Sequence, residues 1–597
     1  MEITKRIESL RASMADAGVQ AYIITGSDPH GSENPPAFWR TREWISGFTG
    51  SAGLVVITPD AAGLWTDFRY WIQAAEELRG SGIRLHREGE DGVADPEAFL
   101  ADRLDPGDVV AVDGRTMVLD ASRRWESRLS DAGVDLRTDL DLVDGLWADR
   151  PGLIDGPVVE LDEEESGESR RKRLERLDGA LREAGADAWV GVQLDSVAWL
   201  LNVRGEDIPY NPVVVGYYVH TPGRRIWFTE PSRIPSSLAD SLSEDGVETA
   251  PYRDFADFVS RMDGGWTVLA DGRTLSRSIV DAFPTNLKLR WAADPVAAMK
   301  ACKNPVEIDR TRRAMEKDAV ALVRFLMDLE ERMDSGEDIS EIDAARLLSD
   351  CRAAIPGFLG ESFSTIPGFG PNGAICHYEA RSGTAAVLRS GAELFLIDSG
   401  GQWDEGTTDV TRTVALGSPS AQQRQDYTRV LKGHVALSRA RFPRGTRGYQ
   451  LDALARAPLW EHGLDYGHGT GHGVGYRLNV HEGPQRLSPK PIDVALEPGM
   501  IVSNEPGLYR EGRYGIRIEN LLVCRDDPSG EFGPFLAFDT LTLAPYDRRL
   551  IDTALLSDGE IRWIDAYHED LRRRLEPLLE EAENRWLAER TKPLAAP

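Results

Sequence analysis

The stretch Ala392 to Leu416, AELFLIDSGGQWDEGTTDVTRTVAL, contains the pattern on which the fold and the chemistry both depend. An apolar run, Leu394 to Ile397, leads into Asp398, a predicted turn covers Gly400 to Gly406, and Asp409 to Val414 returns as a second strand. This predicts a hairpin with one carboxylate on each arm. Buried carboxylates on paired strands repel each other and are costly without compensation, so a shared cation is the simplest resolution.

Three of the ten histidines fall in the segment YGHGTGHGVGYRLNVHEGP, at His468, His472 and His481. His468 and His472 have the spacing of a helical zinc pair, but Gly469 and Gly471 disfavour a helix. We expect an extended glycine-rich loop whose backbone approaches a ligand closely. A lone histidine is more often structural, whereas this clustering with glycine favours a functional site.

Two further carboxylates interrupt apolar runs downstream: Glu505 in MIVSNEPGLYR and Glu519 in YGIRIENLLV. Four carboxylates and at least one neutral imidazole can hold two divalent cations, since the four negative charges offset the four positive ones. Oxygen ligands with one nitrogen suit Mn²⁺ or Co²⁺, and Zn²⁺ is an alternative. Two metals about 3.5 to 4 Å apart can bind a bridging water and polarise a scissile carbonyl. The predicted reaction class is metal-assisted hydrolysis.

Composition limits the other possibilities. The 597 residues include 69 Lys plus Arg against 98 Asp plus Glu, and the net charge of −29 disfavours nucleic acid and anionic membranes as partners. The four cysteines contain no CxxC pair, which argues against a disulfide framework or a thiolate zinc site. The N-terminus lacks a signal-peptide pattern, and no apolar run reaches the ~18 residues of a membrane span. We expect a cytoplasmic protein.

The first half of the chain predicts two similar α/β domains, residues 1–150 and 151–300. The helix-glycine-strand opening MADAGVQAYIIT (Met14 to Thr25) is echoed by ALREAGADAWVGV (Ala180 to Val192), and a Thr-Pro turn and a Trp recur farther along each copy. Chance similarity of such units is the alternative. Between them, Pro and Gly residues near 150 and the acidic run Asp162 to Glu165 indicate a linker that cannot pack as core.

A third region, residues 301–545, is predicted to begin with a long amphipathic helix that has Pro305 at its first turn. From Ala392 to Leu543 the pattern favours strands separated by Gly-rich turns. Residues 546–597 form a predicted helical extension whose apolar stripe, Ile561 to Ala582, repeats every three or four residues. We expect this stripe to dock on the catalytic domain and to share in a dimer interface, although Pro577 would interrupt a long coiled coil.

The ordered set Asp398, Asp409, His472, Glu505 and Glu519, within IDSGG, TDVTRT, GTGHGVG, SNEPG and GIRIEN, resembles the dinuclear metal ligands of the pita-bread metallopeptidases. The resemblance is strongest to the three-domain cytosolic Xaa-Pro aminopeptidases, the aminopeptidase P group, and covers nearly the whole chain. It includes REWISGFTGSAG, LDSVAWLLNVRG, KNPVEI and FDTLTLAP. It implies two creatinase-type α/β domains followed by an α+β pita-bread catalytic domain.

The resemblance also implies residue roles. Asp398 would hold one metal ion, His472 and Glu505 the other, with Asp409 and Glu519 bridging both. The remaining implied positions are catalytic or supporting ones: His377 near the scissile bond, His481 at the proline side, Glu505 as a proton carrier, and His468 and Arg517 as supporting residues. The first domain reads TDFRYW where the family more often has Gly after the Asp, so we do not assign Arg69 to substrate binding.

The implied activity is release of the N-terminal residue from peptides with proline at the second position, by attack of a metal-bridged hydroxide. Two divalent ions are implied, with Mn²⁺ first and Co²⁺ or Zn²⁺ as alternatives, together with a homodimer. A prolidase acting on X-Pro dipeptides is the nearest alternative function. A catalytically inactive, peptide- or protein-binding relative of the same fold is the other alternative, which retention of all five ligand-type residues disfavours.

Overall fold

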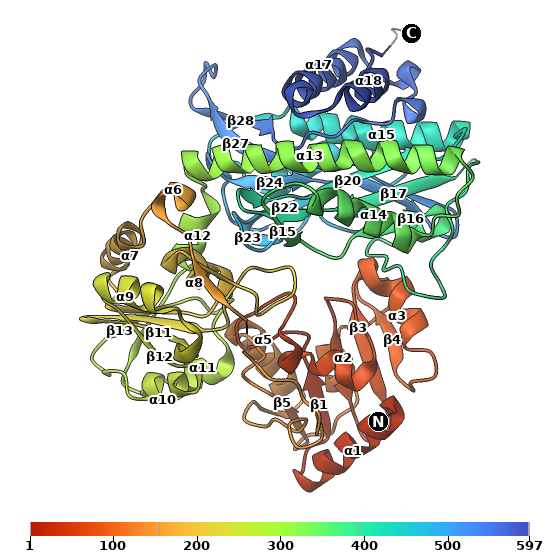
Figure 1. The fold of residues 1–597 in the computed structure, drawn as a ribbon. Helices are drawn as coiled ribbons and strands as arrows, with labels where there is room; N and C mark the ends of the chain where they lie inside the picture. The colour runs from red at the N-terminus through yellow and green to blue at the C-terminus, as the bar shows by residue number, and fades with distance from the viewer. Residues whose placement is uncertain (1, 155, 392, 595–597) are drawn as a thin grey trace. The chain divides into compact units, whose positions relative to one another are not determined.

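The computed structural model describes residues 2–154, 156–391 and 393–594. The chain forms two compact units (Figure 1). The first unit contains the residues up to Asp162 together with Glu168–Val296, and the second contains Glu163–Gly167 and the chain from Ala297 onward. None of the helices in the described part of the chain combines the length and apolar character that a membrane crossing requires.

The first unit contains two six-stranded sheets with the same topology, in the orders β4-β3-β2-β1-β5-β6 and β12-β11-β10-β8-β13-β14. In both sheets the first three strands along the chain are antiparallel neighbours and the other strands join in parallel. The strands of the first sheet are β1 Ala21–Ile24, β2 Leu54–Ile57, β3 Ala62–Thr66, β4 Arg84–Arg87, β5 Val109–Val112 and β6 Asp135–Arg137. Those of the second are β8 Ala188–Gly191, β10 Tyr217–Thr221, β11 Arg224–Thr229, β12 Val247–Pro251, β13 Thr267–Ala270 and β14 Lys288–Trp291.

The repeat predicted from the sequence is therefore confirmed in three dimensions. The echoed segments become the equivalent strands β1 and β8, and the two Thr-Pro turns lie in the equivalent hairpins β2-β3 and β10-β11. Trp65 and Trp227 occupy equivalent buried positions on β3 and β11. Matching strand order, direction and buried residues together exceed what chance similarity of local units would produce.

Helices cover both faces of each sheet in this unit. In the first sheet, Tyr22 and Ile24 pack with α1 on one face, while Ile23 packs with α5 on the other, as the period of two along a strand requires. The helices around the first sheet are α1 Ile3–Asp16, α2 Thr41–Ser46, α3 Trp71–Glu77, α4 Pro96–Ala101 and α5 Leu119–Ser130. Those around the second are α7 Arg170–Ala184, α8 Leu194–Leu201, α9 Ser236–Glu244, α10 Phe255–Ser260 and α11 Arg277–Ala282, and a small ribbon pairs β7 Val158–Glu160 with β9 Val203–Gly205.

The prediction that the acidic run is an unpacked linker was only partly correct. Its side chains avoid the core, but Glu163–Ser166 forms the short helix α6, which packs within the second unit. Arg477 pairs with the Glu165 carboxylate at 2.8 Å, and Tyr476 donates a hydrogen bond to the Glu165 carbonyl at 2.6 Å. Ion pairing replaces the apolar contacts that the composition excludes.

The second unit is built on antiparallel sheets. The largest has the order β21-β28-β27-β24-β22-β23, and beside it are the three-stranded sheets β16-β17-β20 and β15-β18-β19 and the hairpin β25-β26. The strands are β15 Phe358–Glu361, β16 Ile366–Phe369, β17 Leu394–Ser399, β18 Gly401–Trp403, β19 Gly406–Thr407, β20 Val410–Ala415, β21 Arg441–Pro443, β22 Gly471–Gly473, β23 Glu482–Leu487, β24 Ile501–Asn504, β25 Gly507–Arg510, β26 Tyr514–Arg517, β27 Asn520–Asp527 and β28 Phe535–Thr540.

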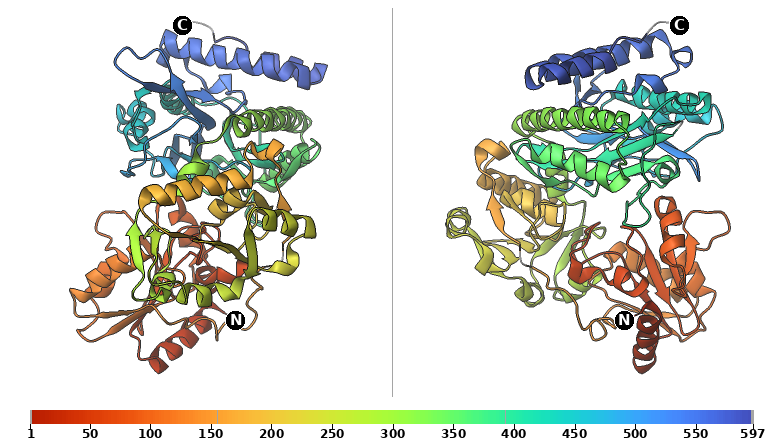
Figure 2. Two further views of the ribbon diagram at one scale, coloured as in Figure 1. Left: turned by 90° about the vertical axis from the view of Figure 1, so that its left-hand side faces the viewer. Right: turned by 45° about the vertical axis from the view of Figure 1, so that its right-hand side comes forward.

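Long helices pack against these sheets (Figure 1, Figure 2). The helix predicted after Pro305 is α13, thirty residues long, with Asn304 and Glu307 forming a capping box at its start. Besides α6, the helices of this unit are α12 Pro295–Ala301, whose first two residues belong to the first unit, α13 Pro305–Asp334, α14 Glu341–Ala353, α15 Ala421–Ser438, α16 Gly448–Trp460, α17 Asp558–Leu575 and α18 Glu581–Arg590.

The prediction of strands throughout Ala392 to Leu543 was wrong in the middle, because α15 and α16 occupy part of that stretch; Ala392 itself lies outside the described residues. The missed signals are local. Ser420 and Gln423 form a capping box, and Tyr427, Val430 and Leu431 are buried at helical spacing.

The C-terminal stripe docks on its own unit, as expected. Ile561, Ile564, Leu571 and Leu575 are buried in the core cluster that also contains residues of α13 and α15. Helix α17 ends at Leu575, a short 3₁₀ turn contains Pro577, and α18 follows. The helix is therefore interrupted at the proline, as predicted.

Candidate functional site

The two aspartates of the opening motif lie on paired strands. Asp398 is on β17 opposite Thr411 of β20, and Asp409 directly precedes β20. The predicted antiparallel pair is thus confirmed, although the predicted turn contains two short strands of its own, β18 and β19. A Cβ on Gly400 would meet the Thr408 carbonyl oxygen at 2.0 Å, so glycine is required where the chain leaves β17.

His472 lies in the middle of the short strand β22, which confirms the expected extended backbone. Its two glycine neighbours allow this close packing: a Cβ on Gly471 would lie 1.9 Å from the Ser503 carbonyl oxygen, and one on Gly473 would lie 2.3 Å from that of Glu482. Nδ1–H of His472 donates to the Gly473 carbonyl at 2.9 Å. This contact fixes the tautomer and leaves the Nε2 lone pair directed at the carboxylates.

The two glutamates come from the ends of neighbouring strands. Glu505 follows β24, and its backbone N–H donates to the Thr470 carbonyl at 2.8 Å. Glu519 lies between β26 and β27 and is 1 % exposed. Its N–H donates to the Thr411 carbonyl at 3.1 Å, and the Thr411 hydroxyl donates to its Oε2 at 2.8 Å. The carboxylates of Glu505 and Glu519 therefore lie at strand ends, close to the β17-β20 pair.

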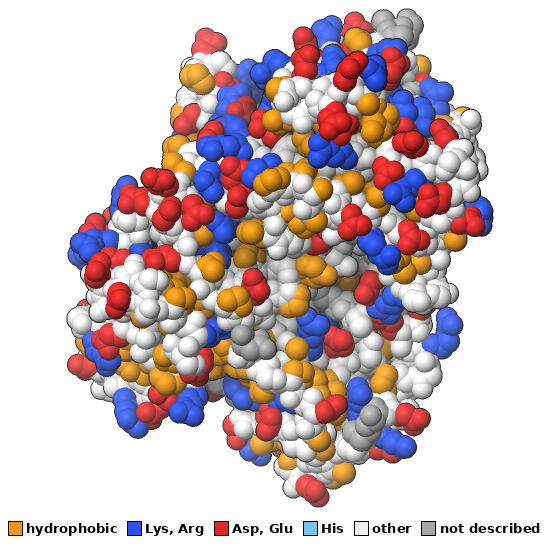
Figure 3. Space-filling model, in the orientation of Figure 1, with side chains coloured by type: hydrophobic (Ala, Val, Ile, Leu, Met, Phe, Trp, Pro, Cys, Tyr) orange, Lys and Arg blue, Asp and Glu red, His pale blue; other side chains and the backbone are white. Residues whose placement is uncertain are grey.

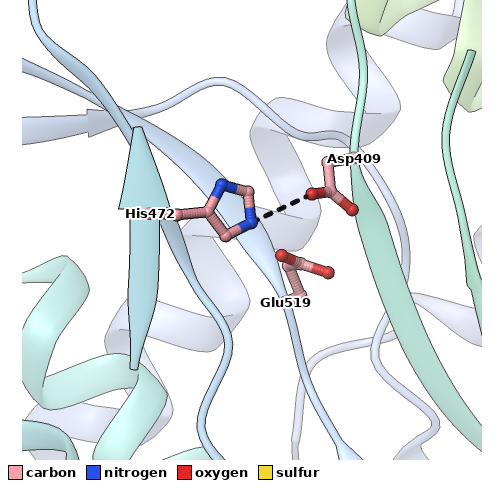
Figure 4. Close-up of side chains that lie close together, drawn as sticks. All are labelled: Asp409, His472 and Glu519. Atoms are coloured by element: carbon pink, nitrogen blue, oxygen red, sulfur yellow. Dashed lines mark ion pairs between the residues drawn. The ribbon is translucent and has the colours of Figure 1, made fainter. Parts of the chain in front are cut away.

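Asp409, His472 and Glu519 converge so that one ligand atom from each lies within 4.8 Å of the others (Figure 4). His472 Nε2 is 3.4 Å from Asp409 Oδ2 and 3.6 Å from Glu505 Oε1. Asp398 is near enough to Asp409 that its negative charge raises the pKa of the Asp409 carboxyl. The structure thus brings together all five residues of the predicted ligand set.

This cluster is electrostatically unbalanced without a cation. Burial, and then repulsion by Asp398, raise the pKa of Asp409 well above its ordinary value, and burial and repulsion by Asp409 do the same for Glu519. Burial and repulsion by Glu519 raise the pKa of Glu505 to about 8. Asp398 Oδ1 is buried with no hydrogen-bond partner among the described residues. Four carboxylates and one imidazole nitrogen fit divalent cations that prefer oxygen ligands.

Arg517 is the cation of this site, and it begins a directed chain of hydrogen bonds. Its Nη2 donates to Asp398 Oδ2 at 2.6 Å, and its Nη1 donates to the Tyr509 hydroxyl at 2.7 Å. The Tyr509 hydroxyl in turn donates to His468 Nε2 at 2.8 Å, since His468 Nδ1–H is used by the Gly469 carbonyl. His468 and Arg517, which the sequence analysis treated separately, are therefore connected through Tyr509.

Sequence reasoning missed Tyr509. It lies on β25 and meets Arg517 of the paired strand β26 only in the folded hairpin, so no short spacing in the sequence signals it. We expect Tyr509→Phe to lower kcat for an X-Pro peptide about 10- to 100-fold, the usual cost of losing a residue that orients metal ligands. Kinetics with metal-saturated enzyme test this. Tyr449→Phe, at an exposed tyrosine on α16, is the control, and an equal loss in both variants would contradict the prediction.

The other two predicted histidines differ in their placement. The exposed His481 packs edge-on against the His472 ring, with centroids 4.3 Å apart and planes at 78°. His377 directly follows Cys376, whose carbonyl oxygen accepts a hydrogen bond from Arg517 at 3.3 Å. Arg69 belongs to the first unit, where it forms a two-point ion pair with Asp67.

The raised carboxyl pKa values predict that metal binding competes with protons. Glu505, with a pKa raised to about 8, holds a proton in the metal-free protein at neutral pH and must release it when a metal binds. We expect the apparent Kd to rise at least about tenfold for each pH unit below 8. Titration calorimetry in buffers of different ionisation enthalpy measures the released protons, and an affinity independent of pH between 6 and 8 would refute this expectation.

Known proteins identify the family. Models of metallopeptidase family M24 match residues 309–526, its C-terminal region matches residues 534–594, and creatinase/prolidase N-terminal domains match residues 6–143 and 149–307. Aminopeptidase P2 of Arabidopsis thaliana is 37 % identical and covers 100 % of this chain and 89 % of its own. Aminopeptidase P1 of Lotus japonicus is also 37 % identical, over 98 % of this chain and 99 % of its own.

A solved structure supports the same assignment at the level of the fold. The crystal structure of X-prolyl aminopeptidase from Caenorhabditis elegans, described as a cytosolic enzyme with a di-nuclear active site, has a TM-score of 0.96 and 33 % identity, and each chain is covered completely. The creatinase-type domains and the pita-bread catalytic domain expected from the sequence are confirmed. This chain belongs to metallopeptidase family M24 and, within it, to the aminopeptidase P group of metal-dependent Xaa-Pro aminopeptidases.

Proposed function

We propose that this protein releases the N-terminal residue from peptides whose second residue is proline. The observation that carries the proposal is the cluster of four carboxylates and one imidazole, buried except for the half-buried His472 and Glu505, set in a chain that matches aminopeptidases P over its full length. Two divalent ions, when bound, lower the pKa of a water molecule and polarise the scissile carbonyl. We propose Mn²⁺ as the native metal, with Co²⁺ and Zn²⁺ as alternatives.

We propose that the metal ions are divided among the five residues as the family resemblance implies. Asp398 would help to hold one ion and His472 and Glu505 the other, with Asp409 and Glu519 shared between them. Arg517 holds the Asp398 carboxylate through its Nη2. The fixed Nδ1–H tautomer of His472 keeps Nε2 available as a ligand.

The remaining residues act on the peptide. We propose that Glu505 carries a proton to the proline nitrogen as the bond breaks, the role that the family resemblance implies. His377 donates a hydrogen bond near the scissile bond, and His481 positions the proline side of the peptide. Because an X-Pro bond has no N–H, selectivity for it depends on the shape of the pocket that accepts the ring.

The activity test uses chelator-treated protein reloaded with Mn²⁺, Co²⁺ or Zn²⁺ and three substrates: Gly-Pro, an X-Pro-Pro tripeptide and a longer X-Pro peptide. Release of the first residue from the longer peptides supports the proposal, and a matched peptide with Ala in place of Pro is the control. Cleavage of Gly-Pro alone would indicate a prolidase. Absence of cleavage with every metal, while two ions still bind, would indicate a binding protein.

We propose a four-part organisation: residues 1–150 and 151–300 as the N-terminal domains, 301–545 as the catalytic domain and 546–597 as the helical extension. The matched family models, with boundaries near 143–149, 307–309 and 526–534, support it. A cytoplasmic location is supported by the cytosolic description of the Caenorhabditis elegans enzyme and by the absence of a disulfide among the described cysteines. On the face drawn in Figure 3 acidic and basic side chains are intermixed, a distribution more compatible with peptide substrates than with nucleic acid.

We propose a homodimer, supported by an apolar surface on α16. Tyr449 and Trp460 are 38 % and 49 % exposed, and eleven residues of helix place them on one face together with Ala453 and Ala457. We expect Trp460→Asp to convert the dimer to a monomer in sedimentation velocity. Phe532→Asp, at an isolated exposed phenylalanine, is the matched control and should leave the dimer intact, and a wild-type protein that sediments as a monomer would refute the proposal.

A further inference from the structure

Three charged side chains form a buried cluster that none of the roles above uses. Lys300 Nζ lies 2.9 Å from Glu482 Oε2, and Lys303 Nζ donates to Glu482 Oε1 at 2.5 Å. The three side chains are 2 %, 1 % and 0 % exposed. Both lysines come from the end of α12 and the turn into α13, whereas Glu482 begins β23, so the cluster ties a helical segment to the sheet.

Stability alone is a weak reason for this arrangement. Removing three charges from water is costly, and apolar residues of similar volume usually stabilise a buried site as well or better. The cluster is better explained by a role in fixing the position of Glu482 and its neighbours.

Glu482 is next to the metal cluster in the sheet. It pairs with Gly473 of β22, the residue after His472, and a Cβ on Gly473 would approach the Glu482 carbonyl oxygen to 2.3 Å. The residue before it, His481, packs against the His472 ring. His481 directly precedes β23, so fixing the Glu482 side chain and the start of the strand limits where the His481 side chain can lie.

We propose that Lys300 and Lys303 are positioning residues that act through Glu482 on His481. The lysines hold the Glu482 carboxylate, the Glu482 backbone holds the start of β23, and His481 is thereby held against His472. Lys303 is itself fixed, since its backbone N–H donates to the Gly499 carbonyl at 3.0 Å. This inference rests on the proposed function, in which His481 positions the proline side of the peptide.

A double-mutant cycle tests the proposal. We expect Lys303→Met to lower kcat/KM for an X-Pro peptide about tenfold or more, and Lys303→Arg to restore it to within about threefold. In a His481→Ala background, Lys303→Met should change kcat/KM less than about twofold, because the group through which it acts is gone. An undiminished effect in that background would overturn the proposal. Lys300→Met serves as the second variant if Lys303→Met does not fold.

Hydrogen exchange gives a readout that does not depend on activity. In Lys303→Met and Lys300→Met we expect faster exchange in peptides covering 478–487, with unchanged metal content. Lys432→Met is the matched control, because it removes a half-buried Lys–Glu pair with Glu560 on α17 and should leave these peptides unchanged. Unchanged exchange in both lysine variants would refute the positioning role. An inactive wild-type protein would refute the proposed function instead, while the exchange experiment would still decide this inference.

Discussion

Glu519→Gln should lower kcat for an X-Pro peptide by about 10³-fold or more, which corresponds to about 4 kcal/mol of transition-state stabilisation. Glu519 is 1 % exposed, one of its carboxylate oxygens lies within 4.8 Å of ligand atoms of Asp409 and His472, and we propose that it is shared by both metal ions. The glutamine retains an oxygen for the Thr411 hydroxyl and for a metal but loses the charge. Metal analysis should give fewer than two ions per chain. Full activity with two bound ions would exclude Glu519 from the site.

The same substitution should stabilise the metal-free protein at high pH. Burial and repulsion by Asp409 raise the pKa of Glu519 in the folded chain, whereas in the unfolded chain it ionises near 4.5. Folding must therefore take up a proton above that pH, and the stability contribution falls as the pH rises. Removing the charge should raise Tm at pH 8 and change it little at pH 4. Calorimetry in the presence of chelator measures both, and Glu581→Gln, at an exposed position on α18, is the control.

Arg412→Leu should lower the free energy of unfolding of the catalytic unit by about 3 to 5 kcal/mol, the usual cost of breaking a buried charged network. Arg412 is 1 % exposed, and its guanidinium donates to the carbonyl oxygens of Glu519 at 2.6 Å, Ala544 at 2.8 Å and Pro545 at 3.2 Å. It also lies 3.2 Å from the Tyr567 hydroxyl of α17. Losing it leaves buried carbonyls without donors and removes the contact between Tyr567 of α17 and the strand that carries Arg412.

Denaturant unfolding followed by tryptophan fluorescence checks this expectation. Arg585→Leu, which removes an exposed ion pair with Glu581 on α18, is the matched control and should cost less than about 1 kcal/mol. Because Arg412 also contacts the Glu519 carbonyl, we expect the variant to bind metal more weakly under native conditions. A loss of stability no larger than that of the control would show that the buried network contributes little.

Local sequence patterns were sufficient to predict features that depend on the chemistry of single residues and their near neighbours. Asp398, Asp409, Glu505 and Glu519 could be recognised because a carboxylate in an apolar run is costly and needs a cation. The glycines around His472 predicted an extended backbone, and their close contacts with Ser503 and Glu482 are the physical reason. The duplicated first half could be read in the same way, because each copy repeats the same helix, strand and turn signals.

Local patterns were insufficient where helices and strands alternate within one catalytic region. α15 and α16 were missed because their apolar residues were read together with the strands on either side. The acidic run at Glu163–Ser166 was read by composition alone, and its packing depends on Tyr476 and Arg477, more than 300 residues away.

The fold class, the repeat, the five ligand-type residues and the family resemblance could all be predicted, because each depends on residue type and short spacing. Three contacts became visible only in the folded chain: Tyr509 joins Arg517 to His468, Arg412 joins α17 to the Glu519 backbone, and two lysines hold Glu482. Those contacts join polar groups from separate elements. Their strength depends on burial and direction, which the order of residues does not specify.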